Sequence, residues 1–298
     1  MAQVQENGDA LAAPIVHAPR EYQAYPGAKY ILPTDDAERQ RQHKTLKSMF
    51  GNRILFAPVE LDENDKVLDV GTGPGLWVLD LAASVDSSTQ MIGVDIETRL
   101  FPASPPKNIQ FRVESVTNLP AEWSNTFSLV HQRLLVVALQ VPQWPTALSE
   151  IYRVLRPNGW VQIAESTPWH DDIEYPAWPC LAKLAALYRA VARSRNLYVD
   201  CAYDMPKMLE AAGFIDVRSE SRMQCMGKWA GENGAAMHSN HVGVLRGIKT
   251  PVLQAGGYGL VSSEAEFDAL VEGLAKEWEE APGCDKEFIV FWARKPSS

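Results

Sequence analysis

The residues best suited to chemistry in this chain are a carboxylate and three glycines in one short stretch. Asp69, Gly71, Gly73 and Gly75 form the pattern acid-x-Gly-x-Gly-x-Gly. Glycine has no Cβ, so a tight turn built from it lets a ligand come against bare backbone. Asp69 stands two residues before the first glycine, where its carboxylate can face the mouth of the turn. The stretch therefore predicts a ligand-binding turn.

A second acid narrows the kind of ligand. Asp95 directly follows the apolar run 91–94. A carboxylate that ends the second strand of a doubly wound sheet can accept both ribose hydroxyls of an adenosine. A nicotinamide dinucleotide fingerprint requires a glycine at the sixth place of the turn, and Leu76 stands there. The sequence thus favours a ligand that contains adenosine and disfavours a nicotinamide oxidoreductase.

Alternating strands and helices must position these residues. Apolar runs predict buried strands, and apolar residues at helical spacing predict the helices between them. The expected strands are 67–70, 91–94, 109–113, 127–131, 160–164, 214–222 and 287–293. The expected helices are 35–50, 76–82, 144–155, 179–196, 204–212 and 264–280. The pattern indicates an α/β, doubly wound, Rossmann-like fold with a ligand at the carboxyl ends of its strands.

The segments outside this sheet predict a cover. Residues 1–33 lack periodicity in their first part and then carry clustered tyrosines, so we expect a partly disordered N-terminal flap. Residues 34–298 form the main domain. Its insertions at about 166–203 and 223–283 are expected to be mostly helical and are rich in aromatic residues and histidines. Ligand pockets have this composition, so the three segments are predicted to cover the site.

The composition limits the partners and the location. The chain has 298 residues, with 28 Lys and Arg against 37 Asp and Glu, and no long basic run, so we expect no double-stranded nucleic-acid partner. No secretory signal and no apolar run of the ~20 residues needed to cross a membrane are visible. Four cysteines without CxxC or metal-ligand spacing predict reduced thiols, a cytoplasmic protein and no metal site. The oligomeric state stays open.

These motifs together resemble one family. The acid–glycine turn and the following acid are similar to motif I and the next acidic residue of class I S-adenosylmethionine-dependent methyltransferases. Within that class the chain resembles the fungal LaeA-like methyltransferases, which often act on natural products. The resemblance covers about residues 30–165 and is carried by Tyr30–Pro33, Asp69–Gly73 with Leu76 and Trp77, Gly93–Asp95, Phe127–Arg133 and Pro157–Trp160. It implies a seven-stranded methyltransferase sheet with an antiparallel last strand.

The resemblance also implies a cofactor, S-adenosylmethionine, and the residues that bind it. The carboxylate and glycines of the turn would shape the methionine pocket. Asp95 would hold the ribose, with Ile96 against the adenine, and Glu114 would meet the adenine amine. Ser115 stands where the family often has a second acid. The predicted cofactor-binding residues are Tyr30, Asp69, Gly71, Thr72, Gly73, Asp95, Ile96, Glu114, Ser115, Val116 and Gln132.

Methyl transfer requires little catalytic machinery from the protein. The nucleophile must be held about 3–3.5 Å from the methyl group and in line with the departing sulfur, and a base is needed only where the nucleophile enters protonated. His170, after the fifth strand, is the first candidate for a base or an orienting group. His131 and His241 are further candidates, although each can serve structure alone. His43 is expected to lie exposed on its helix.

The sequence thus predicts a methyltransferase that moves a methyl group to an O or N atom of a small-molecule acceptor. Methyltransferases of nucleobases or glutamine often carry an Asn/Asp-Pro-Pro-aromatic run after the fourth strand, and residues 131–134 read His-Gln-Arg-Leu instead. Two alternative functions remain. The first is a non-catalytic or regulatory LaeA-like cofactor-binding protein, and the second, which is less favoured, is a nicotinamide oxidoreductase. The sequence identifies neither the acceptor nor the methylated atom.

Overall fold

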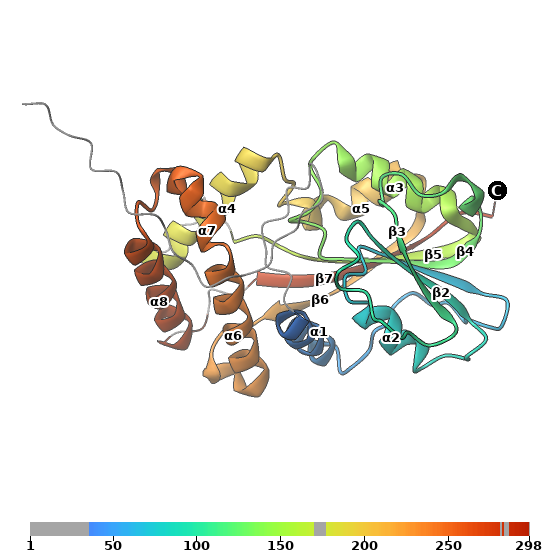
Figure 1. Ribbon diagram of the computed structural model, residues 1–298, viewed down its shortest axis with the longest axis horizontal. Helices are drawn as coiled ribbons and strands as arrows, with labels where there is room; N and C mark the ends of the chain where they lie inside the picture. The colour runs from blue at the N-terminus through green and yellow to red at the C-terminus, as the bar shows by residue number, and fades with distance from the viewer. Residues whose placement is uncertain (1–35, 170–176, 281, 283–285, 298) are drawn as a thin grey trace, which may run out of the picture.

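A seven-stranded sheet forms the centre of the computed structural model, which describes residues 36–169, 177–280, 282 and 286–297 (Figure 1). The strand order is β3-β2-β1-β4-β5-β7-β6. Strands β1 to β5 are parallel, and β7 is antiparallel to both of its neighbours, β5 and β6. The strands are β1 Lys66–Val70, β2 Gln90–Asp95, β3 Ile109–Val113, β4 Phe127–Arg133, β5 Leu155–Ser166, β6 Ile215–Gln224 and β7 Lys286–Arg294.

The central strands are buried along almost their whole length. Every residue of β1 after Lys66 is buried, and so is every residue of β4 before Arg133. Such continuous burial is typical of parallel strands that lie between two helical layers. The edge strand β6, in contrast, is mostly exposed. The ligand-binding turn therefore begins at the end of a strand in the middle of the core.

Helices cover both faces of the sheet (Figure 1). The helices α3 (Gln143–Val154) and α5 (Cys201–Ala211) pack on one face and share an apolar cluster with β1, β4 and β5. On the other face lies α2 (Leu76–Ala82), which packs against β2 and β3. The first described helix, α1 (Asp36–Met49), contacts both α2 and α6 (Gly231–Gly247). This helix therefore connects the sheet domain to the helices beyond its edge.

The remaining helices gather beyond the carboxyl ends of the parallel strands, on the left in Figure 1. They form an apolar core of their own, in which Phe267 and Trp278 of α8 are fully buried together with Leu181 of α4. We call these helices the cover. They are α4 Pro179–Arg195, α6 Gly231–Gly247, α7 Lys249–Gln254 and α8 Glu264–Glu280, joined by the short turns η2 Lys228–Ala230 and η3 Gly256–Gly259.

The predicted fold class is confirmed: the sheet is seven-stranded and doubly wound, the last strand is antiparallel, and the cover is mostly helical. Helix 264–280 and strand 109–113 have the predicted bounds. Helix α5 begins at Cys201, three residues before the predicted start. The flap 1–33 lies outside the described residues, so the proposed division of the chain into flap, domain and insertions stays a prediction.

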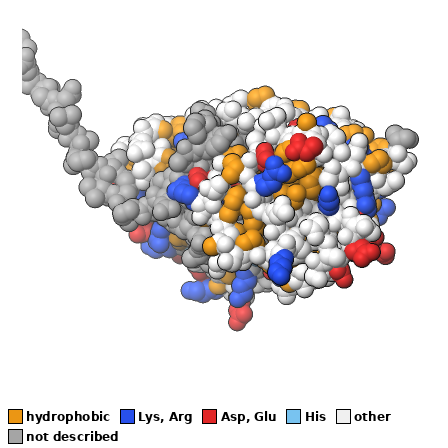
Figure 2. All heavy atoms as spheres, turned by 45° about the vertical axis from the view of Figure 1, so that its right-hand side comes forward, with side chains coloured by type: hydrophobic (Ala, Val, Ile, Leu, Met, Phe, Trp, Pro, Cys, Tyr) orange, Lys and Arg blue, Asp and Glu red, His pale blue; other side chains and the backbone are white. Residues whose placement is uncertain are grey.

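The charged side chains on one face of the molecule are of both signs (Figure 2). Figure 2 shows Lys and Arg side chains interspersed with Asp and Glu side chains on that face. Interspersed charges of both signs, on a chain with a net charge of −9, differ from the single-sign basic patch that binds duplex nucleic acid. The expected lack of a nucleic-acid partner stays a prediction. No described helix is long and apolar enough to pass through a bilayer.

Candidate active site

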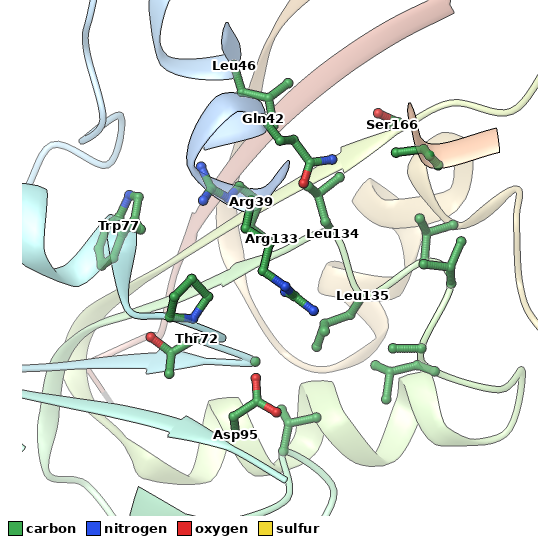
Figure 3. Close-up of a pocket in the computed structure, with 18 of the residues that line it drawn as sticks. Arg39, Gln42, Leu46, Thr72, Trp77, Asp95, Arg133, Leu134, Leu135 and Ser166 are labelled. Carbon is green, nitrogen blue, oxygen red and sulfur yellow. The ribbon is translucent and has the colours of Figure 1, made fainter. Parts of the chain in front are cut away.

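A cavity of about 640 Å³ lies along the carboxyl edge of the sheet (Figure 3). Its turn end is formed by the glycine turn, the end of β2 and side chains of α1. Its cover end is formed by α6, the end of β5 and the start of β7. In Figure 3, Thr72 and Asp95 lie at the turn end, Ser166 lies on the opposite side, and Arg133 points into the space between them. A volume of this size is typical of a ligand site.

The glycines of the turn are required by the backbone. Gly71, Gly73 and Gly75 have φ angles of 65°, 54° and 75°, which other residues adopt at a cost. A Cβ on Gly71 would lie 2.7 Å from a methyl carbon of Leu135, and one on Gly75 would lie 2.4 Å from the Phe111 ring. Both distances are shorter than any normal contact. Glycine is therefore required in this turn for two reasons, the positive φ angles and the lack of room for a Cβ atom.

The carboxylate of Asp69 is held by two neighbours. It accepts hydrogen bonds from the hydroxyl of Thr72 at 2.5 Å and from Nδ1–H of His131 at 2.7 Å. The His131 ring stacks on Trp77 with a centroid distance of 3.7 Å and an angle of 5°. Burial lowers the pKa of His131, although Asp69 acts in the opposite direction, so the ring is neutral. His131 lines the cavity but serves here to fix Asp69.

Asp95 connects the end of β2 to the glycine turn. Its carboxylate accepts hydrogen bonds from the backbone N–H of Gly73 at 2.8 Å and of Glu97 at 3.2 Å. Burial raises the pKa of Asp95, while these two bonds and the charge of Arg39 lower it. The carboxylate therefore lies at the cavity wall with lone pairs still open to a ligand.

The other predicted cofactor residues of β2 and β3 line the same end. Ile96 follows Asp95, and Glu114, Ser115 and Val116 follow β3. Glu114 forms an ion pair with Arg112 at 3.0 Å. Ser115 shares a hydrogen bond of 2.8 Å with Thr117, within a tight turn. The structure thus brings together the residues that the sequence placed at the ends of three different strands.

Two arginines at the turn end were not in the predicted set. The guanidinium of Arg39, on α1, lies against the turn, since a Cβ on Gly73 would be 3.1 Å from its Nη1. Arg133, at the end of β4, points into the cavity (Figure 3). Its position directly after a predicted strand was a signal for it in the sequence. Arg39 gave no such signal, because it is one of several charged residues in the first half of α1.

The expectation that His43 is exposed is wrong. This residue is buried, because α1 is enclosed by α2 and α6. Its Nδ1 accepts a hydrogen bond from Nη2 of Arg133 at 3.1 Å, and its Nε2–H donates to Asp80 at 3.0 Å. Burial and the charge of Arg133 lower the pKa of His43, so the neutral ring links Arg133 to Asp80. Lys47 completes this network by donating to Asp80 at 2.5 Å.

Four other predicted residues lie apart from the turn end or outside the described residues. His170 and Tyr30 lie outside the described residues. Gln132 is fully buried in β4, and it is not part of the cavity wall. His241 lines the cover end, where its Nδ1–H donates to the carbonyl of Met237 at 3.0 Å. Burial lowers the pKa of His241 to about 3, which leaves the ring neutral with Nε2 free to accept a hydrogen bond.

The Thr72 hydroxyl provides a test of this geometry. Thr72→Val keeps the shape of the side chain but removes a hydrogen bond to a buried carboxylate, which is worth about 1.5–3 kcal/mol. We expect the free energy of unfolding to fall by about 1–2 kcal/mol, as measured by urea denaturation. Thr126 is half-buried, and its hydroxyl donates only a solvent-exposed hydrogen bond to the Ser124 carbonyl at 3.3 Å. Thr126→Val is therefore the control and should change the free energy of unfolding by less than about 0.5 kcal/mol. Equal stabilities of the two variants would show that the Asp69–Thr72 bond contributes nothing.

The site holds no recognisable metal-binding group within the described ranges. No set of three His, Cys, Asp or Glu side chains is close enough there to hold a metal ion. The turn end instead combines several carboxylates, among them Asp69, Asp95 and Glu114, with two guanidiniums, a glycine turn and an apolar slot. This donor set suits a molecule with hydroxyls, a carboxylate and a flat ring, and S-adenosylmethionine has all three.

Comparisons with known proteins agree with this geometry. Residues 67–159 match the family model described as "Methyltransferase domain". The N-methyltransferase sirN of Leptosphaeria maculans is 37% identical over 303 aligned positions, which cover 91% of this chain and 96% of sirN. The N-methyltransferase gliN of Aspergillus fumigatus is 28% identical, with 90% and 96% covered. The secondary metabolism regulator laeA of Gibberella zeae is 27% identical, with 72% and 69% covered.

The fold and the site define a class I methyltransferase that uses S-adenosylmethionine. The chain belongs to the fungal natural-product group of these enzymes, the family that includes sirN. The resemblance to LaeA-like methyltransferases is thereby confirmed, as are the predicted cofactor and the predicted transfer of a methyl group to a small molecule.

Proposed function

We propose that this protein methylates a nitrogen atom of a small natural-product acceptor. The observation that carries the proposal is the single cavity, which joins the acid–glycine turn to an aromatic end beneath the cover. A cofactor at the turn end and an acceptor at the cover end would share one space. The names of sirN and gliN, both N-methyltransferases, support nitrogen over oxygen. The cytoplasm is the proposed location, supported by the reduced thiols of Cys180 and Cys201.

The turn end would hold the adenosine. Asp95 would accept hydrogen bonds from the ribose hydroxyls, and Ile96 and Val116 would contact the adenine ring. Glu114 would accept a hydrogen bond from the adenine amine, although it would have to share its carboxylate with Arg112. The glycine turn and Asp69 would lie beside the methionine part. Asp69 is fixed for this by Thr72 and His131, so we propose that His131 positions Asp69 and does not take up a proton.

The two arginines would recognise the carboxylate of the methionine part. Arg39 lies against Gly73, and Arg133 points into the cavity, so both guanidiniums reach the space beside the turn. Arginine matches a carboxylate with two parallel N–H donors. The neutral His43 accepts a hydrogen bond from Arg133 and so keeps that side chain in place. Because the His43 ring carries no charge, the positive charge of Arg133 stays available to the ligand carboxylate.

When bound, the cofactor supplies a methyl group on a positively charged sulfur. The chain's own task is to exclude water from that charge and to align the acceptor with it. Trp169, Met237 and His241 give the cover end an apolar and aromatic wall. His241 is proposed to accept a hydrogen bond from the acceptor through Nε2, because its Nδ1–H is already donated to Met237. His170 remains a proposed orienting group outside the described residues.

A labelling experiment tests the proposal. The purified protein is incubated with S-adenosylmethionine that carries a trideuterated methyl group and with a small-molecule extract of a fungal culture. We expect mass spectrometry to find a product with the label, and fragmentation to place it on nitrogen. A label on oxygen would show that the acceptor is methylated on oxygen and that the proposal of nitrogen is wrong.

The regulatory alternative gives a different outcome in the same experiment. A protein that binds the cofactor without transferring its methyl group would yield no labelled product with any extract. Binding of S-adenosylhomocysteine, measured by calorimetry, would nevertheless be retained. That combination would contradict catalysis and leave the cofactor site in place.

A further inference from the structure

A lysine lies at the cover end of the cavity, apart from the residues proposed to hold the cofactor. Lys286, the first residue of β7, lines this end. Its Nζ lies 4.4 Å from the centroid of the Trp169 ring. The Trp169 ring in turn meets His241 edge-on at 6.0 Å and stacks with Trp278 at 6.0 Å. A positive charge is thus placed within the aromatic wall where the acceptor would lie.

This ammonium has little electrostatic compensation from the described residues. Within the part of the chain that the structure describes, no carboxylate forms an ion pair with Lys286, and the neighbouring Glu287 accepts instead from the Ser221 hydroxyl at 3.0 Å. Burial lowers the pKa of Lys286 to about 8. Lys286 is half-buried, and a cation partly removed from water without an ion-pair partner among the described residues is costly. A ligand that offers it an oxygen lone pair would therefore be stabilised there.

Two acceptor atoms lie at the same end of the cavity. Asn240 is 2% exposed, lines the cavity, and has an Oδ1 atom without a hydrogen-bond partner among the described residues. His241 presents Nε2 as an acceptor because its Nδ1–H is donated to Met237. Buried polar atoms are normally satisfied, so an unsatisfied Asn240 Oδ1 at a cavity wall indicates a ligand donor. The wall therefore combines one charged donor with two acceptors.

We propose that Lys286 determines the chemical class of the acceptor. Its ammonium would donate to a carbonyl or oxyanion oxygen of the acceptor, while Asn240 and His241 would accept from an adjacent N–H or O–H group. The same charge would repel a protonated amine. The acceptor is therefore a neutral or anionic molecule with such an oxygen, and not a cationic amine. This role rests on the proposed function, because it places the acceptor at the cover end.

Binding of two small probes to the full chain tests this role. The probes are para-nitrophenolate, an oxyanion, and benzylammonium, a cation of similar size, each titrated into protein saturated with S-adenosylhomocysteine. We expect the wild type to prefer the phenolate. Lys286→Met should bind the phenolate about tenfold more weakly and benzylammonium more tightly, because the charge is lost while the side-chain volume is kept. Lys286→Arg keeps the charge and should stay within about threefold of the wild type.

Affinity for S-adenosylhomocysteine is the control for folding. Both variants should bind it within about twofold of the wild type, because Lys286 lies away from the turn end. Equal phenolate affinity of Lys286→Met and the wild type, or no phenolate binding to the wild type, would overturn the role of Lys286. A wild-type protein that does not bind S-adenosylhomocysteine would instead contradict the proposed function.

Discussion

Asp95→Ala should weaken the binding of S-adenosylhomocysteine by about a hundredfold. Two ribose hydroxyls that donate to one carboxylate form charge-assisted hydrogen bonds, each worth about 1.5–3 kcal/mol, and a hundredfold change in affinity corresponds to about 2.7 kcal/mol. Asp95 also accepts from the backbone of Gly73 and Glu97. We therefore expect a further loss of about 1 kcal/mol in the free energy of unfolding.

Calorimetric titration of wild type and variant measures the effect. Asp86→Ala is a matched control, because Asp86 also accepts from a backbone N–H, that of Ser88, but is exposed and does not line the cavity. Its affinity for S-adenosylhomocysteine should equal that of the wild type. An Asp95→Ala protein that binds as tightly as the Asp86→Ala protein would remove Asp95 from the cofactor site.

Glu165→Gln should remove a decline in stability that the wild type shows between about pH 4.5 and pH 8. Glu165 is completely buried and accepts hydrogen bonds from the backbone N–H groups of Leu135 and Val136 at 2.8 Å and 3.2 Å. Burial nevertheless raises its pKa from 4.5 to about 8. The folded protein therefore keeps a proton that the unfolded chain loses above its own pKa, so stability falls as the pH rises from about 4.5 to about 8.

The size of this effect is large for one residue. A pKa raised from 4.5 to about 8 corresponds to up to ~5 kcal/mol between these pH values. Glutamine has no proton to keep, so its variant should lack that decline. The Glu165→Gln variant also loses one of the two backbone hydrogen bonds, which lowers its free energy of unfolding by about 1 kcal/mol. The wild type should thus be more stable than the variant near pH 5, and less stable near pH 8.

Urea unfolding at the two pH values measures the difference. Glu150→Gln is the control, because Arg153 lowers the pKa of Glu150 and its carboxylate stays ionised throughout this range. Its stability should change with pH in parallel with the wild type. A parallel change for Glu165→Gln as well would show that Glu165 is already ionised in the folded protein near pH 5.

The turn end of the cavity could be predicted from the sequence because its geometry is local. The acid–glycine pattern lies within one strand and one turn, and Asp95 and Glu114 follow apolar runs directly. In a doubly wound sheet the carboxyl ends of neighbouring parallel strands meet at one edge. The pattern therefore predicted both the residues and their proximity without any knowledge of long-range packing.

The contribution of α1 and the cover could not be found in this way. His43 and Arg133 are 90 residues apart in the chain, and only the packing of α1 against α2 and α6 brings them together. Lys286 resembles any lysine at the start of a strand. It faces a cavity because α6 and the end of β5 complete the wall around it. Such roles depend on packing between distant segments, for which a single sequence carries no periodic signal.

A crystal structure of the protein with S-adenosylhomocysteine tests the division of the cavity most directly. The ribose hydroxyls should lie within hydrogen-bond distance of Asp95, and the methionine carboxylate should contact Arg39 or Arg133. The sulfur should face the wall formed by Trp169 and His241, so that a methyl group on it would point toward the cover end. An adenosine bound away from Asp95, or a sulfur turned away from that wall, would contradict the assignment of the two ends to cofactor and acceptor.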